Sequence, residues 1–245
     1  MALFKKEDLY NHEMLQASQE EGVPLSVLKG FFALESQFEA KSYKYEEHLN
    51  INKLPETSSK RIYASYGISQ ILYTTAQNMG YQGQPEGLYD PYTSAKWGAR
   101  FIANLHKQYP KDLDVIATYN AGWPRPAART TPIIVGIYGQ PGADWVYANQ
   151  PYVDRVAAYI AYYAAVERND QITAQKVHDI LQKKSDWPKE FSKYTEARGY
   201  LRPIYFSEGG SMEGLKKWGL VAFSLLAIYF AVKNIHTTVN GLQRP

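Results

Sequence analysis

Three observations predict that this chain is mainly α-helical. Apolar residues recur at helical spacing in several segments, and no stretch of any length alternates polar with apolar residues as a strand would. Glycines and prolines follow the periodic segments, where helices are expected to end. With 245 residues, 45% of them hydrophobic and 21% charged, the chain can bury a substantial core. We therefore expect a globular protein.

The composition excludes several kinds of chemistry. Cysteine is absent, which excludes disulfides and thiolate catalysis, and the five histidines are scattered without a metal-binding motif. No phosphate-binding glycine loop occurs either. From these observations together, neither a metal nor a cofactor is expected. The net charge of +3, without a basic block, does not indicate a nucleic-acid partner. Any chemistry must come from carboxylates, hydroxyls and amides. The 21 tyrosines are compatible with a sugar-binding cleft and equally with a tyrosine-rich core.

The first two helices are expected near the N-terminus. A charged, amphipathic segment at about residues 5–20 is followed by Gly22, which should end it. Pro24 then stands in the first turn of a second helix, over about residues 24–39. Residues 40–63 are polar and have no clear period, which indicates an excursion on the surface.

The later helices follow from the same signals. They are expected at about residues 74–79, 92–109, 112–119, 151–167 and 171–184. Residues 123–150 are rich in proline and glycine, which predicts a long irregular loop of the kind that is usually functional or mobile. The helix at 151–167 has apolar residues on nearly all sides and should be central and buried.

The candidate catalytic residue is Glu35, because its position in the second helix is one where an apolar side chain would be expected. At 100° per residue it lies within about 20° of Leu28 and about 40° of Phe31, in the apolar stripe. Desolvation favours the protonated carboxylic acid, so a buried Glu35 could serve as a general acid near neutral pH. The alternative is a slightly rotated helix that leaves Glu35 at a solvated rim or paired with an arginine.

The C-terminal part of the chain differs from the rest. We expect one domain at residues 1–184, a linker at 185–213, an apolar helix at 214–236 and a tail at 237–245. The helix contains 15 uncharged residues, Trp218 to Val232, which would cover only about 22 Å of a bilayer core that is about 30 Å thick. Flanking lysines can extend this length over residues 216–235, so either a membrane-spanning helix or a helix packed on protein is compatible with the sequence.

Five short motifs occur in an informative order. They are Glu35-Ser36, Tyr66-Gly67-Ile68-Ser69-Gln70-Ile71, Asp90-Pro91, Tyr119-Asn120-Ala121-Gly122 and Tyr152-Val153-Asp154-Arg155-Val156. Together they resemble the ordered signature of the soluble lytic transglycosylase (SLT) family over roughly residues 20–168. That resemblance implies a mainly α, lysozyme-like helical domain with irregular loop insertions, and a lyase that cleaves bacterial peptidoglycan.

The resemblance also implies roles for individual residues. Glu35 would be the one catalytic acid and base. The substrate-binding candidates are Ser36, Gly67, Gln70, Tyr119, Asn120 and Tyr152. Ser36 would bind substrate or orient the acid, and the hydroxyl of Tyr152 would lie close to Glu35. Structural roles remain open for four of them: a helix hydroxyl for Ser36, a turn cap for Gln70, a helix cap for Asn120 and core packing for Tyr152.

The implied reaction needs only one carboxyl group. The acid protonates the oxygen between N-acetylmuramic acid and N-acetylglucosamine, then takes the proton of the muramic acid 6-hydroxyl as this closes onto C1 to give a 1,6-anhydro product. A usual hydrolase needs a second carboxylate. The only nearby helix carboxylate is Glu39, which is expected to be a solvated or capping charge; if it reached the cleft, a lysozyme-type hydrolase would become possible.

The chain also departs from the family pattern. Ser69 stands where the family commonly has methionine, the spacing from Glu35 to Gly67 is long, which is consistent with an insertion at about residues 42–62, and the loop after Gly122 is expanded. These differences leave the shape of the cleft, its subsites and the product open.

The biological setting is inferred from the chain ends. The N-terminus has no long apolar run or small-residue cleavage site and is not expected to be a secretory signal peptide. Together with the apolar segment, this suggests a phage virion enzyme that acts on the host cell envelope during genome delivery. Alternatives are an enzyme of a conjugation or secretion complex, a lysis enzyme, and a structural protein that binds peptidoglycan without cutting it.

Overall fold

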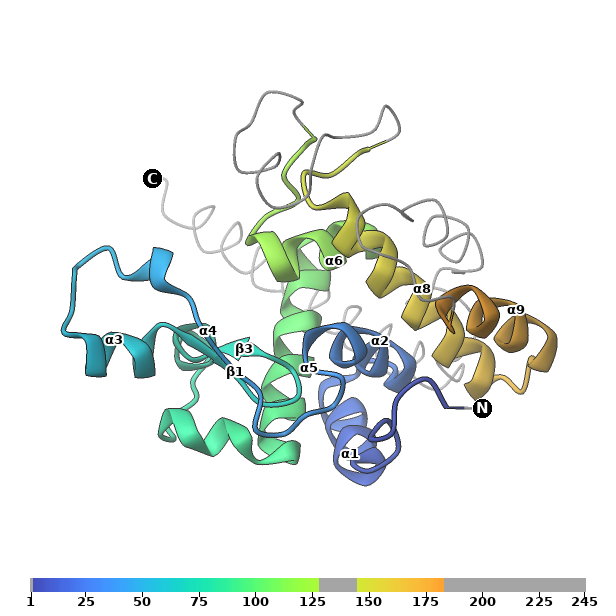
Figure 1. The fold of residues 1–245 in the computed structure, drawn as a ribbon, viewed down its shortest axis with the longest axis horizontal. Helices are drawn as coiled ribbons and strands as arrows, with labels where there is room; N and C mark the ends of the chain where they lie inside the picture. The colour runs from blue at the N-terminus through green and yellow to red at the C-terminus, as the bar shows by residue number, and fades with distance from the viewer. Residues whose placement is uncertain (1, 128–144, 183–245) are drawn as a thin grey trace, which may run out of the picture. The chain divides into compact units, whose positions relative to one another are not determined.

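The computed structural model describes residues 2–127 and 145–182, all within one compact unit, Met1–Tyr205 (Figure 1). Its helices and strands, in chain order, are α1 (Asn11–Glu21), α2 (Leu25–Glu35), β1 (Tyr43–Tyr45), η1 (Glu47–Leu49), α3 (Glu56–Ile62), β2 (Ala64–Tyr66), β3 (Ile71–Leu72), α4 (Tyr73–Asn78), η2 (Pro85–Tyr89), α5 (Pro91–Gln108), α6 (Asp112–Ala121), α8 (Gln150–Glu167) and α9 (Gln171–Gln182). The prediction of a mainly helical class is confirmed for these residues.

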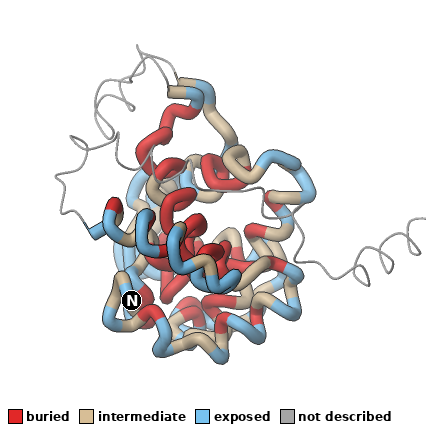
Figure 2. Tube along the Cα trace, turned by 90° about the vertical axis from the view of Figure 1, so that its right-hand side faces the viewer, coloured by how far each residue is buried: buried red, intermediate tan, exposed pale blue. Residues whose placement is uncertain are grey.

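Helices α2 and α8 form the centre of the core. They pack closely because Gly30 has no side chain: a Cβ there would lie 2.2 Å from Cγ1 of Ile160 on α8. The prediction that the helix at 151–167 is buried is confirmed, since nearly all residues of α8 are buried (Figure 2). Because the two helices run in opposite directions, the last residue of α2 lies beside the first turn of α8.

Helix α1 packs against α5 and begins later than predicted. The chain before Asn11 forms turns, in which the carboxylate of Glu7 accepts hydrogen bonds from the backbone N–H groups of Leu3 (2.8 Å) and Phe4 (2.9 Å). The predicted end is confirmed, because Gly22 caps α1 in the left-handed conformation with φ of 68°.

A small sheet adds strands that no pattern in the sequence indicated. Strand β2 lies in the middle, pairs with β1 through Tyr43↔Tyr66 and Tyr45↔Ala64, and pairs with β3 on its other side, both antiparallel. The strands contain only two or three residues, too few to show an alternating pattern in the sequence. The predicted surface excursion at residues 40–63 therefore supplies one strand of this sheet as well as α3.

The predicted linker, apolar helix and tail, residues 185–245, lie outside the described residues, as does the middle of the predicted irregular loop. Among the helices of residues 2–127 and 145–182, none has the length and apolar character needed to cross a membrane.

Candidate functional site

Glu35 is the last residue of α2, which ends four residues earlier than predicted. The helix stops because Gln37 and Phe38 adopt left-handed conformations, with φ of 53° and 62°. This turn buries Phe38 completely in the core. Glu35 is therefore directed from a helix end toward the segments that meet there, rather than from the middle of an apolar stripe.

The surroundings of Glu35 favour the protonated acid. Burial raises the pKa of its carboxyl group to about 7, although a hydrogen bond from Tyr152 opposes this shift. That bond joins the Tyr152 hydroxyl to Oε1 of Glu35 over 2.5 Å. Smaller effects come from the charge of Lys44, which lowers the pKa, and from that of Glu46, which raises it. The acid is thus partly protonated at neutral pH, as a general acid requires.

Ser36 connects the acid to the segment between β2 and β3. Its hydroxyl donates a hydrogen bond to the backbone oxygen of Ile68 (2.7 Å) and lies 3.3 Å from that of Phe32. Since Ile68 is fully buried, this contact fixes the end of α2 against residues 67–70. Of the two roles expected for Ser36, this geometry favours orienting the acid.

Gly67 and Gln70 shape that segment. Gly67 has φ of 70°, and a Cβ there would lie 2.1 Å from the backbone oxygen of Leu88 and 2.5 Å from Oγ of Ser94. Gln70, also left-handed with φ of 48°, folds its side-chain amide back onto the oxygen of Gly67 at 3.0 Å. Only glycine fits at residue 67, so the path of this segment is fixed from both ends.

Tyr119 and Asn120 approach from the end of α6. The Tyr119 ring packs against Phe31 at 4.7 Å between centroids, and its hydroxyl donates to the backbone oxygen of Ser69 at 2.8 Å. Burial raises the pKa of Tyr119 and the negative charge of Glu35 raises it further, which places this tyrosine close to the acid. Asn120 accepts a hydrogen bond from Nδ2 of Asn149 (3.1 Å), just before α8.

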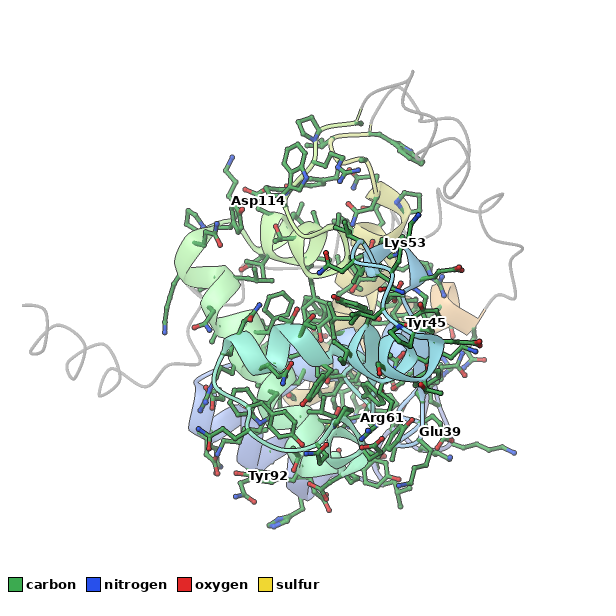
Figure 3. The ribbon with its side chains drawn as sticks, turned by 90° about the vertical axis from the view of Figure 1, so that its left-hand side faces the viewer. Glu39, Tyr45, Lys53, Arg61, Tyr92 and Asp114 are labelled. Atoms are coloured by element: carbon green, nitrogen blue, oxygen red, sulfur yellow. The ribbon has the colours of Figure 1, made fainter. Side chains whose placement is uncertain are left out.

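The structure therefore brings the predicted site residues to one region, where α2 ends, α6 ends, α8 begins and residues 67–70 turn. Glu39, the other carboxylate considered, is not in this group (Figure 3). Its side chain is 47% exposed and pairs with Lys6. That pairing lowers the pKa of Glu39, so it stays ionised. The sequence-based expectation that Glu39 is a surface charge agrees with this placement.

Two charged residues near the acid were not predicted from the sequence. Lys44 and Glu46 flank Tyr45, so they share one face of β1 and its extension, and Nζ of Lys44 lies 2.8 Å from Oε1 of Glu46. The Glu46 side chain is only 17% exposed. The spacing of two opposite charges at i and i+2 is the signal that could have indicated this pair, had the strand been recognised.

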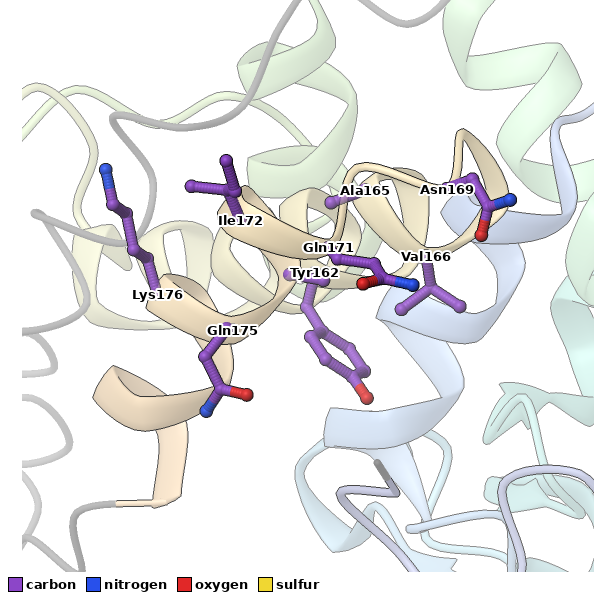
Figure 4. A pocket seen from close by; sticks show the side chains of 9 residues that line it. Tyr162, Ala165, Val166, Asn169, Gln171, Ile172, Gln175 and Lys176 are labelled. Carbon is purple, nitrogen blue, oxygen red and sulfur yellow. The ribbon is translucent and has the colours of Figure 1, made fainter.

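Other kinds of site were sought among the described residues. No group of three or more histidine, aspartate or glutamate side chains that could hold a metal occurs in residues 2–127 and 145–182. A pocket between α8 and α9 is lined by Tyr162, Val166 and Ile172 among others, and shares no residue with the surroundings of Glu35 (Figure 4). We therefore regard the region around Glu35 as the candidate active site.

Comparisons with known proteins agree with this site. No curated protein and no solved structure matches the chain. Residues 13–128 match the family model for the transglycosylase SLT domain, a range that contains Glu35, the 67–70 segment and the end of α6 but not Tyr152. Members of this family are lytic transglycosylases that act on peptidoglycan. Residues 13–128 are therefore similar to the transglycosylase SLT domain, and this match supports a lysozyme-like protein of the SLT family.

Proposed function

We propose that this protein is a lytic transglycosylase that cleaves the bond between N-acetylmuramic acid and N-acetylglucosamine and leaves a 1,6-anhydro product. The observation that carries this proposal is the environment of Glu35: a carboxyl group whose burial raises its pKa to about 7, at a helix end and held by the Tyr152 hydroxyl. Such a group can donate a proton at neutral pH and take one back afterwards.

In the first step, the protonated Glu35 gives its proton to the glycosidic oxygen. The bond from this oxygen to C1 of the muramic acid breaks, the N-acetylglucosamine end leaves as an alcohol, and positive charge develops on the sugar ring. The ionised Glu35 that results is stabilised by the hydrogen bond from Tyr152.

In the second step, Glu35 accepts the proton of the muramic acid 6-hydroxyl while the oxygen of that hydroxyl bonds to C1. This restores the protonated acid, and no water is consumed. Tyr152, which bonds the carboxyl group, and Ser36, which fixes the end of α2 to Ile68, would keep the carboxyl oxygen of Glu35 within reach of both proton positions.

A gel containing peptidoglycan, together with mass analysis of the soluble products, tests the proposal. The wild-type protein should clear the gel and release anhydro ends, whereas Glu35→Gln should do neither. Equal clearing by both proteins would remove Glu35 from the mechanism. A failure of the wild-type protein to clear would favour a structural protein that binds peptidoglycan without cutting it.

A lysozyme-type hydrolase is the second candidate, and the position of Glu46 favours it. Its charge acts on Glu35 and its side chain is largely buried, so it could activate a water molecule as the second carboxylate of an inverting enzyme. Under this alternative the products carry reducing ends, and Glu46→Gln abolishes cleavage. Anhydro products with an active Glu46→Gln variant would exclude it.

We further propose that the enzyme is carried in a phage virion and opens the cell wall locally during genome delivery, acting in the envelope of the host. Support comes from the apolar run at residues 218–232, which could attach it to a membrane or to another protein of the particle. A conjugation or secretion complex and a lysis enzyme are the alternatives. Truncation after Ser211 should abolish membrane partitioning and leave cleavage intact; unchanged partitioning would exclude this segment as the anchor.

A further inference from the structure

The chain that follows α6 forms a short ribbon with the chain that precedes α8. Gly122 ends α6 in the left-handed conformation, with φ of 78°. The N–H of Ala148 donates to the oxygen of Arg125 (2.8 Å), the N–H of Ala127 donates to that of Val146 (3.0 Å), and Pro126 bridges Tyr147. The backbone around Trp123 and Arg125 is thus fixed although it lies outside any helix.

Two side chains of this ribbon have no evident task in the folded protein. Trp123 is 48% exposed, and the guanidinium of Arg125 lies 5.4 Å from the centre of its ring. Nε of Arg125 is buried without a hydrogen-bond partner, and Arg125 forms no ion pair with any residue of 2–127 or 145–182. Two other arginines in this part of the chain differ: Arg61 binds Glu86 and Arg100 binds Glu21.

An arginine with a buried, unsatisfied donor favours a ligand that brings an acceptor. A buried donor that is left unpaired is unfavourable, and a carboxylate bound to the guanidinium would supply charge-assisted hydrogen bonds. The exposed Trp123 ring beside it offers a flat apolar surface on which a sugar or peptide can lie. Together the two side chains suit a ligand with a carboxylate next to an apolar face.

The ribbon is near the candidate active site. Ala148, bonded to Arg125, precedes Tyr152 by four residues, so their backbones are less than about 14 Å apart even if extended. Asn149 also donates from Nδ2 to the backbone oxygen of Ala117 and to Asn120, which binds the ribbon to the end of α6. A polymer lying across Glu35 can therefore reach Arg125.

We propose that Trp123 and Arg125 form a subsite for the stem peptide of peptidoglycan, in which Arg125 binds a free carboxylate of the peptide and Trp123 contacts the adjoining apolar surface. This inference rests on the proposed function. In the glycan strand itself the muramic acid carboxyl is consumed in the amide bond to the peptide, so free carboxylates belong to the peptide. A cation placed to bind the peptide carboxylate thus favours peptide-bearing strands over stripped ones, whose only free carboxylate is the one that the amidase releases beside the sugar ring.

Cleavage of two substrates tests the subsite: intact glycan strands, and strands whose peptides have been removed with an amidase. The ratio of kcat/KM for intact over stripped strands should fall about tenfold in Arg125→Ala, consistent with the loss of one charge-assisted hydrogen bond. Arg125→Lys should retain part of the preference because it keeps the charge but not the forked donor. Arg61→Ala, which removes an exposed arginine paired with Glu86, is the matched control and should leave the ratio unchanged.

An unchanged ratio in Arg125→Ala, or an equal loss on both substrates, would overturn the inference. Thermal unfolding of each variant identifies a loss that arises from misfolding. Binding of soluble muropeptides to Glu35→Gln, measured by calorimetry with and without Arg125→Ala, separates this inference from the proposed function. If Arg125→Ala weakens binding of peptide-bearing fragments, the subsite stands even where the wild-type protein fails to cleave and the transglycosylase assignment is lost; equal binding refutes the subsite itself.

Discussion

Tyr152 donates a 2.5 Å hydrogen bond to Oε1 of Glu35, and so connects the first turn of α8 to the last residue of α2. These residues are 117 positions apart in the chain. The contact depends on the close packing of α2 on α8, which Gly30 permits. The acid therefore has its orientation fixed by the helix pair at the centre of the core, rather than by a loop.

The pH dependence of cleavage should follow Glu35. Because burial raises its pKa to about 7, the acid form needed in the first step is lost above this pH. We expect kcat/KM to decrease above pH 7 by about tenfold per pH unit. Initial rates on soluble glycan strands between pH 5 and 9 measure this decrease, the alkaline limb of the pH profile. A decrease that begins at the ordinary carboxyl pKa would contradict the burial of the acid.

The same shift predicts how stability depends on pH. The folded pKa of about 7 lies above the ordinary value of 4.5, so the folded state holds this proton more tightly and loses stability as pH rises between these values. Glu35→Gln cannot ionise, so at pH 8 it should be more stable than the wild type by about 1–3 kcal/mol, after allowance for partial exposure. At pH 4 the two proteins should be similar. Urea unfolding at both pH values provides the test.

Tyr152→Phe should change both the pH profile of cleavage and its rate. Removing the hydroxyl removes a hydrogen bond that stabilises the carboxylate, so the pKa of Glu35 rises and the alkaline limb moves to higher pH. At the same time kcat decreases because the acid loses a contact that orients it. Tyr92→Phe is a suitable control, since Tyr92 bonds Glu20 on the exposed surface. A lower rate with an unmoved limb would mean that Tyr152 acts only through packing.

Substitutions of Lys44 and Glu46 should shift the alkaline limb of the pH profile in opposite directions. The positive charge of Lys44 lowers the pKa of Glu35, so Lys44→Met should move the limb up, whereas Glu46→Gln removes a negative charge and should move it down. The double variant should lie between the two, and high salt should reduce the shift caused by the exposed Lys44. Shifts of both variants in one direction would show that the pair acts through the shape of β1 instead of through its charges.

Local signals predicted the helix boundaries that glycine and proline determine. Gly22 ends α1 and Pro91 stands in the first turn of α5, where their backbone preferences act within a few residues. The end of α2 could not be predicted in this way. It depends on Gln37 and Phe38 adopting positive φ, which their residue types do not indicate, and on the burial of Phe38, which is a tertiary effect.

The site was predicted in part, for a related reason. The order of the motifs indicated Glu35, Tyr119 and Tyr152, and the structure places these three together. The influence of Lys44 and Glu46 was missed because β1 has only three residues and shows no period. Their proximity to the acid arises from the pairing of β1 with β2, a contact between segments that no local pattern encodes.

Gly67→Ala tests how strictly the segment beside the acid is fixed. Alanine would have to adopt a strained positive φ of 70° here, and its Cβ would lie only 2.1 Å from the backbone oxygen of Leu88. We therefore expect a loss of about 2–4 kcal/mol in the free energy of unfolding. Gly22→Ala is the matched control: it has nearly the same φ, 68°, with no atom within 4 Å of the added Cβ, and should cost about 1 kcal/mol. Cleavage should decrease in Gly67→Ala, because Ser36 is bonded to Ile68 in this segment, and should persist in Gly22→Ala. Equal costs in thermal unfolding would mean that residues 67–70 can move away from Leu88, and the acid would then lack the rigid support that its geometry implies.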